Sequence, residues 1–405
     1  MAPAQARPRR FVSRLIGFSV KSLVVLAIAI VAAWFAARPS TPDGFYNHPL
    51  PADATAGALL KIESFSRSVP PDALGWRILY VTTRSGRPAL ASAVVVTPRS
   101  KSGSALRVIA WAHGTTGIVA GCAPSILAKP FDNVPDMAAI VREGWAYVGT
   151  DYPGLGTAGG HTYLVAEDAA HAVLDAVRAA RKMKVANLGD QVVVWGHSQG
   201  GNSALWAGVR AGEVAPELKV AGVAALAPAS DLGALVASAK SSMFGKIVSS
   251  YLVAAYAQAY PDVKVRDYAR GMTRTVAADI AKRCVGGYAT LLSVAETFLL
   301  PAGGIFSRDP NSGPLGARLS ENTPTGLILS PLLIAQGEAD DLVSPDVQKR
   351  YVAARCAAGE LIDYRTYPGR DHVSVVASDS ALARDIVEWT RDRFEGKPIG
   401  LACRL

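Results

Sequence analysis

Ser198 is the residue whose surroundings most directly suggest chemistry. It stands in the pattern GHSQG at residues 196–200, between the apolar run VVVW and a stretch of small residues typical of a helix. A strand, a tight turn and a helix in this order predict a nucleophile elbow, in which the glycines leave room for the turn and the serine hydroxyl is exposed. We therefore expect Ser198 to act as a nucleophile. The alternative is an ordinary glycine-rich turn.

A serine hydroxyl needs a base, and His372 is the histidine best placed to supply it. It lies in the loop PGRDH at residues 368–372, after the last predicted strand. Loops at the carboxyl ends of strands line the sites of doubly wound sheets. The remaining histidines have weaker positions: His48 in a linker, His113 after an early strand, His161 in a glycine-rich loop, His171 on what we expect to be a solvated helix face, and His197 inside the elbow.

The base in turn needs a carboxylate that orients it and stabilises its protonated form. Asp340 follows the apolar run PLLIAQ in a short loop, and we expect it to have this role. Asp341 is the alternative and Glu338 the third candidate. The order Ser, Asp, His along the chain is the order found in α/β-hydrolases.

Acyl transfer through a tetrahedral intermediate also requires donors for its oxyanion. The backbone N–H of Gln199, directly after the nucleophile, is the first predicted donor. The second is expected in the loop HGTTG at residues 113–117, after the strand RVIAWA. There we expect the Thr115 N–H to donate, with support from the Thr116 hydroxyl. The alternative for this loop is a simple glycine turn.

Strands and helices alternate along most of the chain, which predicts an α/β fold with a doubly wound, mostly parallel sheet. Strands are expected at 77–83, 91–97, 107–113, 145–150, 191–195, 220–227, 331–336 and 361–367. Helices are expected at 135–143, 163–182, 199–212, 345–358 and 381–394. The predicted hydrolase core therefore comprises residues 52–231 and 328–405.

Residues 232–327 interrupt this alternation, because about 100 residues separate two strands that a short crossover would connect. Helical patterns at 242–260 and 275–300 predict an inserted helical cap, or lid, over the site. Its apolar residues suit an acyl chain: Phe244, Ile247, Tyr251, Tyr256 and Tyr260. The alternative is an extra subdomain without a role in binding, since apolar stripes on helices are usually core.

The N-terminus is typical of an export signal. Residues 1–14 are basic, and residues 23–37 are an unbroken apolar run. We predict a cleaved signal peptide or a retained signal anchor at 1–37, followed by a linker at 38–51. The protein is then secreted, periplasmic or anchored to the outer face of the cytoplasmic membrane.

The charge and the motifs exclude several classes of function. The formal net charge is +9, but residues 1–37 hold five basic and no acidic residues. The rest of the chain has no basic cluster, so no nucleic-acid partner is expected. No Walker A or HExxH pattern occurs and no GxGxxG pattern follows the first predicted strand, so no metal or cofactor is expected. The four cysteines, at 122, 284, 356 and 403, suit an oxidising compartment and allow three pairings.

With these residues in place, the chain resembles the secretory lipase family, the α/β-hydrolases related to Candida lipase A, as a bacterial-type member. The resemblance runs from about Phe45 to the C-terminus. Its motifs are AHGTTG at 112–117, TDYPGLGT at 150–157, WGHSQGG at 195–201 and GEADDLVSP at 337–345. The resemblance implies a secreted lipase or esterase with a Ser-Asp-His triad and a cap over an acyl tunnel. It also implies two disulfides, Cys122–Cys284 and Cys356–Cys403.

The expected function is therefore hydrolysis of carboxylic esters, with triacylglycerols among the candidate substrates. The substrate would be a small-molecule or lipid ester, with contact to a membrane or lipid interface. The same triad would serve an exported acyltransferase or a serine peptidase, which are the alternatives. A non-catalytic binding module on a hydrolase fold is a further alternative, although such modules typically lack the nucleophile or the base.

Overall fold

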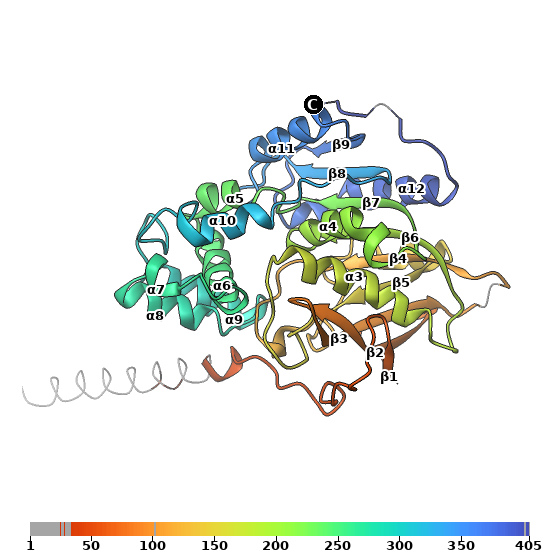
Figure 1. Ribbon diagram of the computed structural model, residues 1–405, viewed down its shortest axis with the longest axis horizontal. Coiled ribbons are helices and arrows are strands. Elements are labelled where there is room, and N and C mark those ends of the chain that lie inside the picture. The colour runs from red at the N-terminus through yellow and green to blue at the C-terminus, as the bar shows by residue number, and fades with distance from the viewer. Residues whose placement is uncertain (1–24, 26–27, 29–33, 101–102, 401, 405) are drawn as a thin grey trace, which may run out of the picture.

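One nine-stranded sheet, with a parallel centre, organises the described part of the chain (Figure 1). The computed structural model describes residues 25, 28, 34–100, 103–400 and 402–404. The strand order is β1-β2-β3-β5-β4-β6-β7-β8-β9; β5 to β9 in this order pair in parallel, and β1, β2 and β3 pair antiparallel. The strands are β1 (Leu59–Ser64), β2 (Ala73–Arg84), β3 (Arg87–Pro98), β4 (Leu106–Ala112), β5 (Ala146–Thr150), β6 (Leu188–His197), β7 (Lys219–Leu226), β8 (Leu332–Gly337) and β9 (Ile362–Tyr367).

Helices cover both faces of this sheet, which confirms the predicted doubly wound α/β fold. The first face packs against α3 (Ala166–Ala180), α4 (Gln199–Val214) and α11 (Pro345–Ala357). The opposite face packs against α2 (Met137–Arg142) and α12 (Ala381–Phe394). Two short 3₁₀ turns, Ala120–Cys122 and Ser374–Val376, lie in the loops.

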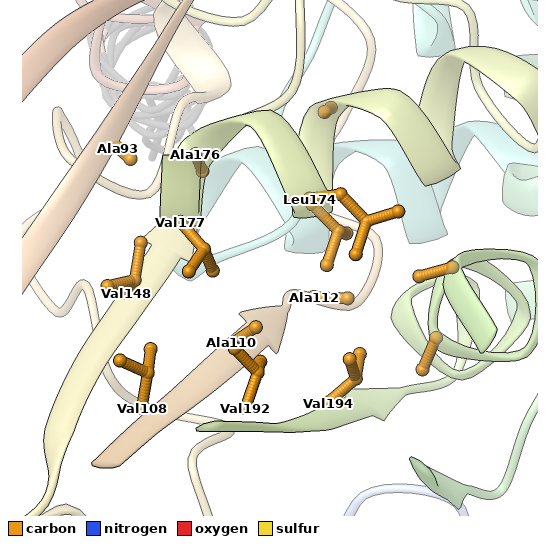
Figure 2. Packing of buried hydrophobic residues seen from close by; sticks show 14 of the residues in the cluster. Ala93, Val108, Ala110, Ala112, Val148, Leu174, Ala176, Val177, Val192 and Val194 are labelled. Carbon is orange, nitrogen blue, oxygen red and sulfur yellow. The ribbon is translucent and has the colours of Figure 1, made fainter. Parts of the chain in front are cut away.

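The central strands are apolar on both sides because both sides are covered. In β4, Val108 and Ala110 pack toward α3, whereas Ile109 and Trp111 belong to the cluster on the opposite face. Figure 2 shows the first of these interfaces, in which Val177 of α3 lies above the small strand side chains. This two-sided burial explains the unbroken apolar runs, which are typical of parallel strands.

Six helices between β7 and β8 form a separate group at one end of the sheet (Figure 1). They are α5 (Leu232–Ala239), α6 (Met243–Ala259), α7 (Val265–Tyr268), α8 (Gly271–Ile280), α9 (Gly287–Thr297) and α10 (Gly313–Glu321). They share a buried apolar cluster, to which the segment Tyr163–Val165 before α3 also contributes. The group is therefore packed on the sheet domain beside α3. The division into a core and a functional cap stays a prediction.

The helical pattern at 275–300 corresponds to the end of α8 and to α9, because the chain leaves the helical path between these two helices. In this break Cys284 pairs with Cys122, and the Val285 N–H donates to the Thr116 carbonyl at 2.8 Å. The Val285 N–H is therefore not available for a helical hydrogen bond, whereas the N–H groups of residues 281–283 still donate back to carbonyls of α8. The sequence pattern does not reveal this long-range interaction.

Two further expectations need correction. His171 does not lie on a fully solvated face: its side chain is 22% exposed, and Asp168 and Asp175 beside it are buried because α3 packs against β2 and α4. The alanine-rich sequence of α3 makes its two faces look alike. The edge strand β1 was not predicted, because its half-exposed residues LLKIES carry no strong apolar pattern.

Both disulfides implied by the family resemblance are present. Cys122 pairs with Cys284, with the Cα atoms 5.3 Å apart, and Cys356 pairs with Cys403, with the Cα atoms 5.8 Å apart. The predicted signal peptide or anchor at 1–37 lies largely outside the described residues. Within the described residues, no helix is both long and apolar enough to span a bilayer.

Candidate active site

Ser198 occupies a strained turn between β6 and α4. Its φ of 56° and ψ of −116° lie in a region that a non-glycine residue rarely adopts. A Cβ on Gly196 would collide with the Gly200 backbone, and one on Gly200 would collide with the Ala112 carbonyl. The Ser198 N–H donates to the Leu226 carbonyl at 2.9 Å. These contacts give the sharp geometry that the GHSQG pattern predicts and fix the serine above the ends of the strands.

His372 reaches Ser198 from the loop after β9. Its Nε2 lies 2.8 Å from Ser198 Oγ, and its Nδ1 lies 2.8 Å from Asp340 Oδ2. The histidine is buried, and the Asp340 side chain has no exposed surface. In this arrangement Nδ1–H donates to the carboxylate and Nε2 accepts the serine proton, which is the geometry that general-base activation requires.

Asp340 is held by several donors after β8. Its Oδ1 accepts the backbone N–H groups of Leu342 at 3.0 Å and Val343 at 2.8 Å, and its Oδ2 accepts the Gln336 amide at 3.0 Å. These bonds fix the carboxylate beside His372. The alternatives Asp341 and Glu338 are both exposed. Among the three candidate acids, the structure brings only Asp340 to the histidine.

His197 supports the His372 loop, which the sequence did not indicate. Its Nε2–H donates to the backbone carbonyl of His372 at 2.8 Å, and the two rings lie 5.0 Å apart. Burial, together with the neighbouring His372, lowers the pKa of His197 to about 3. A neutral His197 places no positive charge beside the base. The one feature of the sequence that could have indicated this role of His197 was its position next to Ser198.

The loop at residues 113–117 lies beside the serine, as expected. A Cβ on Gly114 would lie 3.7 Å from the Cβ of Ser198, so the loop backbone packs directly on the elbow. The Thr115 hydroxyl hydrogen-bonds the Tyr163 hydroxyl at 2.7 Å. Thr116 Oγ1 is buried and has no hydrogen-bond partner among the described residues. The Thr116 hydroxyl is therefore a free donor in a residue that lines the same cavity as Ser198.

Gln199 begins α4, so its N–H belongs to the first helical turn, whose amides have no partner within the helix. The Gln199 side chain is buried, and its amide Nε2 lies 2.9 Å from His161 Nε2. Burial is the main cause that lowers the pKa of His161 to about 3. The neutral ring accepts from Gln199 while its Nδ1 faces the Pro153 carbonyl at 3.3 Å. His161 thus lies behind the site and does not reach Ser198.

A cavity of about 300 Å³ opens over Ser198 and His372. Its lining includes polar loop residues: Thr115, Thr116, Lys129, Asp132 and Asn133. Apolar lining residues come from α6 and the loops after α8, β8 and β9: Phe244, Ile247, Val248, Val285, Leu342 and Val373. The site therefore combines polar groups with apolar walls, the usual composition of a small-molecule site.

The described residues contain no group of three or more His, Cys, Asp or Glu side chains arranged to hold a metal ion. The arrangement instead offers a nucleophile, a base, an orienting acid and amide donors. This set of groups is suited to acyl transfer through a covalent intermediate.

Comparisons with known proteins point to lipases. A model of the secretory lipase family matches residues 133–307. The "Probable inactive lipase MT1628" of Mycobacterium tuberculosis is 24% identical over 382 residues, which cover 88% of this chain and 82% of the relative. Lipase A of Moesziomyces aphidis is 24% identical over 400 residues, which cover 88% of this chain and 84% of the relative.

Solved structures share the fold. The X-ray structure of Candida antarctica lipase A matches with a TM-score of 0.71 and 18% identity, covering 89% of this chain and 87% of that one. The rice cell wall degrading esterase LipA of Xanthomonas oryzae matches with a TM-score of 0.66 and 20% identity, covering 86% of this chain and 100% of that one. The α/β-hydrolase fold expected from the sequence is confirmed.

Proposed function

Because this chain is related to the secretory lipase family, as its motifs predicted, we propose that it is an exported serine hydrolase that cleaves carboxylic esters. The observation that carries the proposal is the continuous chain of hydrogen bonds from Ser198 through His372 to Asp340. One relative is named as inactive. In this chain all three residues are present and in contact, which supports activity.

In the proposed reaction, Ser198 Oγ attacks the carbonyl carbon of the ester while His372 Nε2 takes its proton. The protonated ring is stabilised by Asp340. When the tetrahedral intermediate collapses, the C–O bond to the alcohol breaks and His372 returns the proton to the leaving alcohol. Water then attacks the acyl-enzyme by the same route, which releases the carboxylic acid and restores Ser198.

The proposed oxyanion donors are the Gln199 N–H and the Thr115 N–H, with the Thr116 hydroxyl as a third group. Their support is the direct contact between the loop and the elbow and the absence of another partner for Thr116 Oγ1 among the described residues. Such donors stabilise charge that develops only in the transition state, and they mainly raise kcat.

The helices between β7 and β8 are proposed to form a substrate-binding cap. Phe244, Ile247 and Val248 of α6 line the cavity, and Phe244 is 46% exposed beside it. An acyl chain placed on these side chains would remove apolar surface from water, which favours binding. Of the five aromatic and apolar side chains expected to serve this role, only Phe244 and Ile247 line the cavity. Tyr251, Tyr256 and Tyr260 pack in the cluster that α6 shares with its neighbours.

Export and contact with a lipid interface are also proposed. The basic and apolar segment at 1–37 and the two disulfides support export. Large apolar side chains are exposed on or directly after α9: Tyr288, Leu291, Phe298 and Leu299, each at least 65% exposed. A second cavity, lined by Tyr288 and residues 36–40, shares Val285 with the first, so the start of α9 adjoins the mouth of the site. Exposed apolar patches of this kind mark interaction surfaces.

The direct test is hydrolysis of p-nitrophenyl esters from acetate to palmitate by a chain that begins at Pro39, beside its Ser198→Ala variant. The proposal predicts that hydrolysis is lost in the variant, while the circular dichroism spectrum is unchanged. The chain-length optimum then distinguishes an esterase from a lipase.

A folded wild-type chain that hydrolyses none of these esters would contradict the proposal. Product formation only with an added alcohol or sugar acceptor would instead indicate an acyltransferase. Cleavage restricted to aminoacyl amides would indicate a peptidase.

A further inference from the structure

The segment Arg283–Val285, in the break between α8 and α9, lies directly against the loop that carries the proposed oxyanion donors. We propose that this segment is a positioning element that holds Thr115–Gly117 in its catalytic geometry, through the Cys122–Cys284 disulfide and the Val285 amide. The proposal rests on the ester-hydrolase function proposed above. It gives one of the two disulfides a role in catalysis in addition to its role in stability.

Two bonds join the segment to the loop side of the site. The Val285 N–H donates to the Thr116 carbonyl at 2.8 Å, which fixes the peptide plane that follows Thr116. One residue earlier, Cys284 is bonded to Cys122, which lies in the 3₁₀ turn five residues after Gly117. The loop is therefore attached to the helical group on both sides of Gly117.

Gly117 shows how closely the two backbones approach. Its φ is +125°, and a Cβ at this position would lie 2.6 Å from Cys122 Sγ and 2.9 Å from the Arg283 carbonyl oxygen. No side chain fits there without displacing the disulfide or the segment. The loop thus packs against the segment with backbone atoms, and a movement of the segment would be transmitted to Thr116.

The segment is itself held in place. The Tyr251 hydroxyl of α6 donates to the Arg283 carbonyl at 3.0 Å. Arg283 is 5% exposed, and its guanidinium pairs with Glu296 of α9, at 2.6 Å, and with the half-exposed Asp279 of α8. The pair with Glu296 is bidentate, and bidentate pairs of this kind fix geometry well. The segment therefore acts as a rigid support between α8 and α9.

The other end of the loop is connected to the same helices. The Thr115 hydroxyl bonds the Tyr163 hydroxyl, and the Tyr163 ring contacts the Tyr251 ring edge-to-face at 6.3 Å. Tyr251 thus contacts both supports of the loop. A misplaced donor would weaken the stabilisation of the oxyanion and leave ground-state binding nearly unchanged, so the expected effect is on kcat.

The second disulfide provides a matched control. Cys356 lies in α11, and the Cys403 N–H donates to Ile362 at the start of β9. A Cβ on Gly117 would collide with Cys122, whereas neither Cys356 nor Cys403 is among the atoms nearest to the glycines of the loop. Loss of either disulfide removes a constraint on the unfolded chain and lowers stability. Only loss of Cys122–Cys284 should also alter the loop.

The experiment compares the double variants C122A/C284A and C356A/C403A in the chain that begins at Pro39, well below both melting temperatures. For p-nitrophenyl butyrate we expect kcat to fall about tenfold or more in the first variant and less than about twofold in the second, with KM changing less than about threefold in both. Hydrogen exchange of the peptide that contains residues 113–117 should be faster in the first variant only.

A second pair of variants keeps the disulfide and removes only the amide donor. Val285→Pro deletes the N–H that bonds Thr116, whereas Val285→Ala keeps it. We expect kcat of V285P to be about tenfold lower than that of V285A, and hydrogen exchange at 113–117 to be faster.

Equal kcat values within both pairs, with unchanged exchange of the loop, would overturn the proposal. So would a loss of kcat that merely follows the fall in melting temperature in both disulfide variants. If the wild type hydrolyses no ester, the proposed function fails, and the exchange comparison still decides whether the segment holds the loop.

Discussion

The sheet core and the group α5–α10 line the same cavity but contribute to it differently. The core supplies Ser198, Asp340 and His372 from the carboxyl ends of three parallel strands, each fixed by short polar contacts. The helical group supplies apolar side chains such as Phe244 and Ile247, and it contacts the oxyanion loop through one backbone segment. In the proposed function, the core would therefore determine which bond is cleaved, and the helices would determine which acyl group is accepted.

The largest effect is expected at Asp340, the proposed triad acid. Asp340→Asn should lower kcat by about 10⁴-fold, because the amide no longer stabilises the His372 tautomer whose Nε2 accepts the serine proton. Asp341→Asn is the matched control, since Asp341 is the next residue and is exposed. Steady-state kinetics of both variants, with circular dichroism as a check of folding, measure this difference. Similar losses in both variants would disprove the assignment of Asp340.

A smaller effect is expected in the oxyanion loop. Thr116→Val has nearly the same shape and removes the hydroxyl that has no other partner among the described residues. We expect kcat to fall by about 10²-fold, with KM nearly unchanged, if the hydroxyl donates to the oxyanion. The inhibition constant of a boronic acid, which forms a tetrahedral adduct with the serine, should rise in parallel. An unchanged kcat would remove Thr116 from the proposed site.

Substitutions in α6 should change substrate preference and leave the chemistry intact. Phe244→Ala should raise KM for long p-nitrophenyl esters by about fivefold, equivalent to about 1 kcal/mol of lost apolar contact, and should affect the acetate ester less. Kinetics across the ester series measure this. A uniform loss for every chain length would mean that Phe244 does not contact the acyl chain.

Substitution of the exposed apolar side chains on α9 and directly after it should weaken binding to lipid and leave catalysis unchanged. The triple substitution L291S/F298S/L299S should weaken partition of the protein onto phosphatidylcholine vesicles about tenfold and leave hydrolysis of soluble esters unchanged. Leu361→Ser is the control, because Leu361 is 63% exposed, like Leu291 at 65%, but lies between α11 and β9. If the wild type, the triple variant and Leu361→Ser partition equally in a vesicle sedimentation assay, α9 has no role in lipid binding.

The smallest effect concerns the buried Asp151 after β5. Burial raises its pKa to about 6, although Ser92 and Ser125 donate to it. The folded state keeps this proton while the unfolded state loses it near pH 4, so stability falls as the pH rises from about 4 to 6. Asp151→Asn lacks this dependence, and the Tm of the wild type should fall by about 2–4 °C relative to the variant over this range. A difference in Tm between the two proteins that stays the same at all pH values would contradict the raised pKa of Asp151.

The sequence allowed more to be predicted about the core than about the helices above it. The elbow at Ser198 and the loops after β8 and β9 depend on local patterns, namely glycines beside the serine and polar residues after apolar strands. The break at Cys284 and the support of the His372 loop by His197 depend on contacts between residues more than 150 positions apart. Periodicity within a segment cannot encode such contacts, which is why the helical pattern at 275–300 did not reveal the break between α8 and α9.

Covalent trapping tests most directly whether Ser198 is the nucleophile. The chain would be treated with a fluorophosphonate, and the modified peptide would be located by mass spectrometry. We expect one adduct, on Ser198, formed rapidly by the wild type and much more slowly by Asp340→Asn. A folded wild type that forms no adduct, or an adduct on a different residue, would contradict the assignment of Ser198 as the activated nucleophile.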